Sequence, residues 1–316
     1  MPENFSKSAS WNFLEKNKTI LLEKSYFLIY LKYVFARKCR HNLIAAFLLY
    51  YSERDITIMR YNNLEKFQES IKNGKLCIGC CITFTDPAIT EIAAEAGFDF
   101  CWIDGEHGVL DRNTAMLHIM ALKGTDCAPF YRVPACDHTE IKRVIDFAPA
   151  GIIVPMVMNE KDAEYVVAAC RYPLAGNRGC GVRRGHCYGS MPIDEYMERA
   201  KEEPLVILQI EHIEAVRNLD KILKVPGINS ILIGPYDLTC SMGKPGQWDD
   251  PEVIAVIDEV CAKTREAGIL LGAYAEADLS RWLNQRKIQY ISCINDTGAL
   301  MAGFINKIKE VNGAKN

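Results

Sequence analysis

Two carboxylates in this sequence follow short apolar runs and are of the type that binds a hard divalent cation. Glu211 ends the run Leu205–Glu211, and Asp237 follows the run Ser230–Gly234. Gln209 lies two residues before Glu211, so on a strand both side chains point to one face. Oxygen ligands without a thiolate favour Mg²⁺ or Mn²⁺, with water and a chelating small molecule completing the octahedron. The alternative is a pair of carboxylates held in salt bridges to arginines.

An arginine and a histidine near the ends of two other apolar runs suit charge stabilisation and proton transfer. Arg132 has a fixed fork of N–H donors, which holds negative charge developing on a ketone oxygen. His107 follows a glutamate in the loop Asp104–Gly108, and a histidine titrates near neutrality, as a general base requires. The alternatives are a structural ion pair for Arg132 and an ordinary loop histidine for His107.

These residues lie in a chain that alternates between short β-branched runs and longer amphipathic segments. The expected strands are Leu76–Thr83, Phe98–Asp104, Ala128–Val133, Gly151–Val157, Leu205–Glu211, Ser230–Gly234, Ile269–Ala275 and Gln289–Ile294. Apolar residues three and four apart predict helices over Pro87–Ala96, Asp137–Phe147, Glu160–Tyr172, Ile213–Leu223 and Pro251–Ala267. Repeated βα units with continuously apolar strands indicate a parallel sheet.

The length and the first βα turn distinguish a closed barrel from an open sheet. The span from Met59 to Asn316 holds 316 − 58 = 258 residues, against roughly 250 for a typical (β/α)₈ barrel. An open doubly wound sheet would carry a glycine-rich phosphate loop after its first strand, whereas Thr83–Ala88 contains no glycine. We therefore predict an α/β fold, a (β/α)₈ TIM barrel, with its chemistry at the carboxyl ends of the strands.

Composition narrows the kind of partner. The chain is 49% apolar and 24% charged with a net charge of −3, so it lacks the basic excess typical of nucleic-acid binding and is expected to bind a small molecule. Its 13 cysteines are scattered through apolar runs, which indicates a reducing, cytoplasmic location. We predict that Cys77, Cys80 and Cys81 are buried as small apolar residues and do not form a metal site.

The first 58 residues differ in charge from the rest. Residues 1–58 carry nine Lys or Arg against five Asp or Glu, whereas residues 59–316 carry 28 against 35. Leu43–Tyr51, the longest clean apolar stretch, is about half the ~20 residues of a spanning helix, so no membrane span is expected. Residues 1–58 are either an amphipathic extension or translated upstream sequence, and we favour a dispensable segment before a natural start at Met59. The barrel domain is expected over residues 59–316.

Several motifs match the order and spacing of one known family. They are Asp104–Gly108, Arg132–Pro134, Ile141–Asp146, Gly151–Met156, Arg171–Gly179, Gln209–Glu211 and Ile233–Leu238. From about Met59 to its end, the chain resembles the HpcH/HpaI group, the class II pyruvate aldolases. These enzymes act on 4-hydroxy-2-oxo acids such as 4-hydroxy-2-oxoheptanedioate and on 2-keto-3-deoxy sugar acids such as 2-dehydro-3-deoxyglucarate.

The resemblance implies a barrel in which a divalent metal, Mg²⁺, Mn²⁺ or Co²⁺, is bound by Glu211 and Asp237. The metal would chelate the carboxylate and ketone of pyruvate, with Gln209 supporting the bound substrate. The backbone around Pro235 and Tyr236 would receive the substrate carboxylate.

For the chemistry, the resemblance implies that Arg132 stabilises the enolate. His107, oriented by Asp146, would move the proton of the aldol hydroxyl. The family also implies a homo-oligomer, a hexamer or trimer of dimers with exchanged C-terminal helices.

The chain departs from the family pattern at positions that bear on the aldehyde. The family usually has a small residue where Tyr236 stands and an aromatic one where Cys81 stands, and Tyr274 is bulky on the aldehyde side. In the Gly-rich loop, Arg178, Arg183 and Arg184 would either meet a distal carboxylate or fix the loop. The metal chemistry is expected to hold, and the acceptor aldehyde is left open.

Three rival functions are weighed against a metal-dependent aldolase. A Schiff-base aldolase needs a lysine inside the barrel, and none of the expected strand ends carries one. A CoA-ester lyase of the citrate-lyase-like group shares the barrel and carboxylate pair, but the short strand-end loops and the lack of an additional domain disfavour a bulky thioester. A non-catalytic barrel would be favoured only if the metal ligands or Arg132 were missing.

Overall fold

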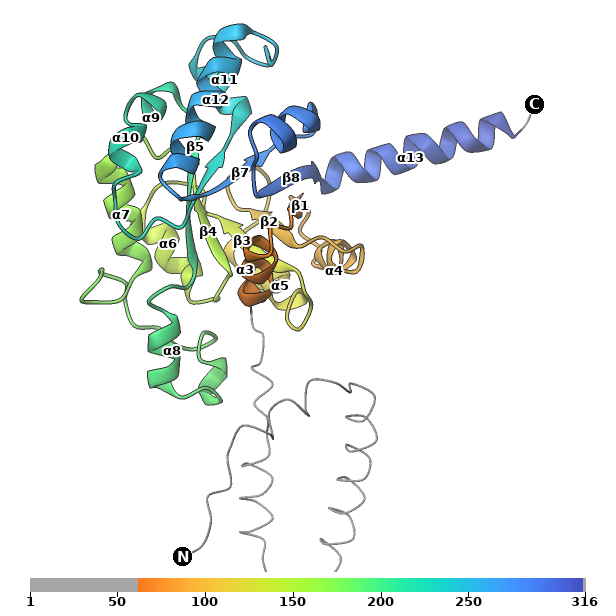
Figure 1. Ribbon diagram of the computed structural model, residues 1–316. Coiled ribbons are helices and arrows are strands. Elements are labelled where there is room, and N and C mark those ends of the chain that lie inside the picture. Colours follow the sequence, from red (N-terminus) through yellow and green to blue (C-terminus); the bar gives the residue numbers. More distant parts are fainter. Residues whose placement is uncertain (1–61, 315–316) are drawn as a thin grey trace, which may run out of the picture. The chain divides into compact units, whose positions relative to one another are not determined.

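Eight parallel strands close into a barrel, as predicted. The computed structural model describes residues 62–314, so the predicted extension over residues 1–58 lies outside the described residues. Each strand pairs with its sequence neighbour, and β1 pairs with β8 to close the ring (Figure 1). The strands are β1 (Cys77–Ile82), β2 (Phe100–Asp104), β3 (Ala128–Arg132), β4 (Gly151–Val154), β5 (Leu205–Ile210), β6 (Ser230–Ile233), β7 (Leu270–Tyr274) and β8 (Tyr290–Asn295).

Helices follow the strands and most lie around the barrel, whereas α3 precedes β1 and α13 projects away from the barrel (Figure 1). They are α3 (Leu64–Lys72), α4 (Ala88–Glu95), α5 (Arg112–Ala121), α6 (His138–Ile145), α7 (Glu160–Cys170), α8 (Ile193–Arg199), α9 (Ile213–Arg217), α10 (Leu219–Ile222), α11 (Pro235–Ser241), α12 (Pro251–Glu266) and α13 (Asp296–Gly313). The single helix expected over Ile213–Leu223 is divided into α9 and α10 at Asn218, whose side-chain amide donates to the carbonyl of Met158 at 3.0 Å.

Aromatic rings fill the barrel at the amino ends of the strands. Phe67 of α3 lies 4.9 Å from Phe130 and 5.7 Å from Tyr290 between ring centroids, both in edge-to-face geometry. Phe100 stacks on Phe130 at 5.1 Å. Such aromatic pairs add roughly 0.5–1.5 kcal/mol each beyond the area that they bury. Helix α3 therefore closes this mouth of the barrel, and the open end lies at the carboxyl ends of the strands.

Strand alternation places the cysteines as predicted. Cys77 and Cys81 of β1 belong to the interior cluster with Phe100 and Tyr290, whereas Cys80 packs in the outer cluster between strands and helices. All three are buried and free. Within residues 62–314, no helix is both long and apolar enough to cross a membrane.

The interior aromatic layer leaves no room for a side chain at Gly272 of β7. A Cβ there would lie 2.1 Å from Cζ of the fully buried Tyr290, whose hydroxyl is held 2.8 Å from Ser230 Oγ. We expect Gly272→Ala to lower the free energy of unfolding by about 2 kcal/mol, as overpacking does. The melting temperature should fall by roughly 4–8 °C. Gly303→Ala in α13, where a Cβ has open space, is the matched control, and equal melting temperatures for the two variants would contradict this packing.

Candidate active site at the carboxyl ends of the strands

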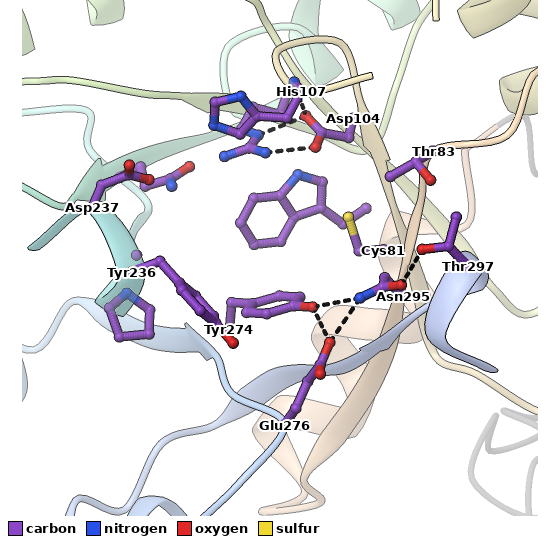
Figure 2. A pocket seen from close by; sticks show the side chains of 15 residues that line it. Cys81, Thr83, Asp104, His107, Tyr236, Asp237, Tyr274, Glu276, Asn295 and Thr297 are labelled. Carbon is purple, nitrogen blue, oxygen red and sulfur yellow. Dashed lines mark hydrogen bonds and ion pairs between the residues drawn. The ribbon is translucent and has the colours of Figure 1, made fainter. Parts of the chain in front are cut away.

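A cavity of about 440 Å³ opens at the carboxyl end of the barrel (Figure 2), within the usual size range for a small-molecule site. Its lining includes most of the residues singled out from the sequence, and these are His107, Arg132, Gln209, Pro235, Tyr236, Asp237 and Tyr274. Glu211 is buried beside them, with 2% of its surface exposed. The other lining residues are Cys81, Thr83, Trp102, Asp104, Gly234, Glu276, Asn295 and Thr297.

Arg132 is held rigidly by two neighbours on β2 and the loop after it. Asp104 pairs with Arg132 in the β2–β3 register, and its carboxylate accepts from Nε at 2.8 Å and from Nη2 at 2.6 Å. Nη1 lies 2.9 Å from Glu106 Oε2, and the guanidinium lies 4.8 Å from the ring centroid of Trp102. Burial lowers the pKa of Arg132, but the hydrogen bond and charge of Asp104 outweigh it, so the pKa is raised.

Glu106 joins Arg132 to His107. Its Oε2 lies 3.8 Å from His107 Nε2, and the imidazole is largely exposed at the cavity rim. Burial raises the pKa of Glu106, whereas the charges of Arg132 and His107 lower it, and Asp104 and Asp237 raise it further. His107 and Arg132 thus lie at one cavity, with Glu106 between them.

Gln209 and Glu211 point to the same side of β5, as the two-residue spacing indicates. The amide of Gln209 donates to Glu211 Oε2, and the N–H of Met156 donates to Glu211 Oε1 at 2.7 Å. Oε1 of Gln209 is buried without a hydrogen-bond partner. A Cβ at Gly234 would lie 2.7 Å from both Gln209 Nε2 and Glu211 Oε2, so only a glycine fits this close to the two side chains.

Burial is the main reason why the pKa of Glu211 rises from its ordinary 4.5 to about 8. The Met156 N–H lowers the pKa, while the charges of Glu106 and Asp237 raise it and that of Arg132 lowers it. Asp237 itself is exposed in the first turn of α11. Several carboxylates thus share one end of the barrel with a single guanidinium that is already paired.

Among the described residues no group of three or more His, Cys, Asp or Glu has the arrangement of a metal site.

The cavity wall on the β7–β8 side is polar. Tyr274 donates its hydroxyl to Glu276 Oε1, and Asn295 donates its amide to the same oxygen at 2.8 Å and to Tyr274 Oη at 3.1 Å. Figure 2 shows this group across the cavity from His107 and Asp104. Burial is the main cause that raises the pKa of Tyr274, which keeps its hydroxyl protonated as a donor.

An aromatic edge borders the cavity beside Asp237. The ring of Tyr236 is 55% exposed and lies 4.7 Å from Trp248 and 6.3 Å from Tyr274 between centroids. Pro235 is buried at the first position of α11.

The structure does not bring Asp146 to His107 within one chain, contrary to the expected pairing. Asp146 caps the carboxyl end of α6, and this helix runs back from the rim toward the start of β4. Its carboxylate is 3.1 Å from Arg178 Nη2. Arg184 is likewise buried, with Nη1 donating to the carbonyl of Phe147 at 2.7 Å. These two arginines fix the Gly-rich loop, and neither they nor Arg183 line the cavity.

Sequence reasoning assigned no role to several cavity residues. Asp104 and Glu106 belong to the segment Asp104–Gly108 that the sequence already marked. Asp104 ends β2 as Arg132 ends β3, and this matching position could have predicted an ion pair between them. Glu276 and Asn295 follow or end β7 and β8, and no sequence motif marked them. Their contact depends on the pairing of β7 with β8, which spacing along the chain does not reveal.

Comparison with known proteins agrees with this geometry. The family model for HpcH/HpaI aldolase/citrate lyase matches residues 78–288. The chain belongs to the HpcH/HpaI family. The crystal structure of an HpcH/HpaI aldolase from Desulfitobacterium hafniense DCB-2 superposes with a TM-score of 0.72 and 26% identity, covering 77% of this chain and 95% of that one.

Two curated relatives of this HpcH/HpaI protein are named aldolases. A hydroxypyruvate/pyruvate aldolase of Roseobacter denitrificans is 35% identical over 68% of this chain and 84% of its own length. A 5-keto-4-deoxy-D-glucarate aldolase of Citrobacter koseri is 35% identical over 69% of this chain and 85% of its own length. The protein is therefore a lyase of the aldolase type.

The raised pKa of Glu211 gives a stability test in the presence of a chelator. Because the pKa is about 8 in the folded state against 4.5 ordinarily, the folded state retains a proton that the unfolded chain releases. The resulting stability is present below pH 4.5 and is lost as the pH rises through 8. We expect the melting temperature of Glu211→Gln minus that of the wild type to increase between pH 5 and pH 9. A difference that stays flat over this range would contradict the assignment.

Proposed function

We propose that this aldolase cleaves a 4-hydroxy-2-oxo acid into pyruvate and an aldehyde with the help of a divalent cation. The observation that carries this proposal is the hydrogen bond between the buried side chains of Gln209 and Glu211 beside Gly234, one strand from Asp237. The relatives, a hydroxypyruvate/pyruvate aldolase and a 5-keto-4-deoxy-D-glucarate aldolase, support a small 2-oxo acid as substrate.

The donor set fits Mg²⁺ or Mn²⁺, with Co²⁺ as a further candidate. Glu211 and Asp237 would hold the ion, since both supply hard oxygen atoms and no thiolate. Gln209 Oε1 is a buried acceptor without a partner, and it belongs to the same amide that donates to Glu211 Oε2. Two carboxylates with water and substrate oxygens are a usual environment for Mg²⁺. The cation would act as a Lewis acid on the 2-oxo group while the C3–C4 bond breaks.

Arg132 is suited to hold the negative charge that develops on the 2-oxo oxygen. A guanidinium has five N–H donors, and two are used in hydrogen bonds to Asp104, which leaves three that are not hydrogen-bonded within the described chain. The ion pairs and the Trp102 ring fix its plane before substrate arrives. A charge donor oriented in advance costs no reorganisation during the reaction.

His107 is the candidate for moving the proton of the C4 hydroxyl. Its ring lies at the rim of the same cavity as Arg132, and Glu106 lies 3.8 Å from its Nε2. In cleavage His107 would accept the hydroxyl proton as the aldehyde forms, and in condensation it would return it. We therefore assign the supporting role once expected of Asp146 to Glu106. The backbone at Pro235 and Tyr236 remains the candidate for the substrate carboxylate.

Two rival mechanisms have less support. No lysine lines the cavity among the described residues, so a Schiff base lacks its amine. The family model covers citrate lyases as well as aldolases, but both relatives named above are aldolases, which favours an aldehyde over a CoA ester.

We expect Glu211→Gln to lower kcat at least about 1,000-fold, as loss of an oriented charged group in a catalytic site does, while the fold is kept. A coupled assay of pyruvate release over a panel of 4-hydroxy-2-oxo acids with added Mn²⁺ measures this. Excess chelator should abolish wild-type turnover, and borohydride with substrate should trap no adduct. Glu214→Gln is the matched control, because Glu214 is exposed and pairs with Arg217. Full turnover in chelator or in Glu211→Gln would refute the mechanism.

We also infer a homo-oligomer in a reducing, cytoplasmic compartment. Helix α13 extends away from the barrel (Figure 1) and exposes a series of large apolar side chains. They are Leu300, Met301, Phe304, Ile305, Ile308 and Val311. A patch of this kind on a helix favours contact with another copy. The cysteines between Cys77 and Cys293 are all free, which fits a reducing environment.

The oligomer is tested by placing charge on this helix. We expect Phe304→Glu combined with Ile308→Glu to reduce the particle mass measured by light scattering, because each charge would be buried without a partner. The double variant Lys307→Glu and Lys309→Glu changes charge on the same helix at polar positions and should keep the mass. A wild-type mass equal to one chain would contradict the inference.

A further inference from the structure

The wall formed by Tyr274, Glu276 and Asn295 is a rigid hydrogen-bonding surface. The amide nitrogen of Asn295 is used by Tyr274 and Glu276. Its carbonyl oxygen accepts from Thr297 Oγ1 at 2.5 Å and from the Gly298 N–H at 2.7 Å. The amide orientation is therefore fixed at both ends.

Glu276 is the member of this wall with capacity left for a ligand. Its Oε1 accepts from both Tyr274 and Asn295, while the described part of the chain offers no recorded donor to Oε2. The side chain is exposed at the cavity. The wall thus offers a ligand a carboxylate oxygen, which accepts hydrogen bonds and repels anions.

Among residues 62–314, the cavity is lined by no lysine or arginine that is free of a carboxylate partner. Its acidic lining residues are Asp104, Asp237 and Glu276, and Arg132 is the one lysine or arginine that lines it among residues 62–314. Arg132 is already paired with two carboxylates. Arg281 lines an adjacent cavity that also includes Tyr274 and Glu276, and its Nε is 3.1 Å from Asp278 Oδ2.

We propose that Glu276 makes this aldolase select an uncharged, hydroxyl-bearing aldehyde and discriminate against one that ends in a carboxylate. The inference rests on the proposed function, because it concerns the aldehyde half of the same cavity. A terminal hydroxyl of the acceptor donates to Glu276. A terminal carboxylate in the same place faces a like charge and loses hydration without gaining a partner.

The proposal sets this chain apart from its relative named for 5-keto-4-deoxy-D-glucarate, a dicarboxylate. Glu276 would then be the side chain that recognises the end of the aldehyde farthest from its carbonyl group. In the Gly-rich loop, Arg178 pairs with Asp146 and Arg184 donates to the carbonyl of Phe147, and none of the loop's three arginines lines the cavity.

The test compares two acceptors that differ only at their last carbon. D-Glyceraldehyde ends in CH₂OH and tartronate semialdehyde ends in a carboxylate. With pyruvate and Mn²⁺ we expect wild-type kcat/KM to favour D-glyceraldehyde by about tenfold, which corresponds to ~1.4 kcal/mol. In Glu276→Gln this ratio should fall about fivefold, mainly through a lower KM for tartronate semialdehyde, in line with the strength of a partly exposed charge pair.

Glu95→Gln is the matched control, since Glu95 is exposed at the end of α4 and does not line the cavity. It should keep the wild-type ratio. A wild type that prefers tartronate semialdehyde, or a Glu276→Gln ratio within twofold of the wild type, would overturn the proposal. An unchanged ratio in Glu276→Gln would be expected if Arg281 set the acceptor preference. In that case Arg281→Gln would lower kcat/KM for tartronate semialdehyde.

Exchange of the pyruvate methyl protons in deuterated water, without any aldehyde, tests the proposed function separately from the role of Glu276. Exchange together with the wrong acceptor preference would overturn the role of Glu276 and leave the proposed function standing. Absence of both exchange and condensation would overturn the proposed function and this inference with it.

Discussion

The pairing of β1 with β8 is the constraint on which the rest of the structure depends. It joins Cys81 to Asn295 across more than two hundred residues of chain and turns eight successive strands into a ring. The ring gathers the ends of β2, β3, β5 and β6 around one cavity and sets Tyr274, Glu276 and Asn295 opposite them. At the other mouth, α3 and the aromatic layer seal the barrel, so substrate has access from the carboxyl ends only.

Charge balance connects the cavity to its chemistry. Asp104, Glu106, Glu211 and Asp237 lie near one guanidinium, and burial leaves Glu211 with a raised pKa. Two of these carboxylates are occupied in fixing Arg132. The other two are left for a cation, whose charge would relieve the repulsion between them. Within the described chain, Glu276 also has no lysine or arginine partner in this cavity. The proposed cation site and the proposed aldehyde preference therefore both follow from the excess of carboxylates over cationic side chains.

Much of this was predictable because it depends on local pattern. Apolar runs gave all eight strands, and the two-residue spacing of Gln209 and Glu211 gave their common face. Contacts that require the closed ring were not predictable. Asp146 matched a family motif, but the direction of α6 carries it toward the start of β4, where it meets Arg178. Glu276 and Asn295 bear on the cavity only because β7 and β8 lie side by side, which no local spacing encodes.

The proposed cleavage depends most on a cation held by Glu211 and Asp237 and shared with the 2-oxo acid. Titrating the protein into Mn²⁺ and following free Mn²⁺ by electron paramagnetic resonance, with and without pyruvate, measures this directly. The account predicts one ion bound per chain, tighter binding when pyruvate is present, and loss of binding in Glu211→Gln. Undiminished binding by Glu211→Gln, or no binding by the wild type, would contradict it.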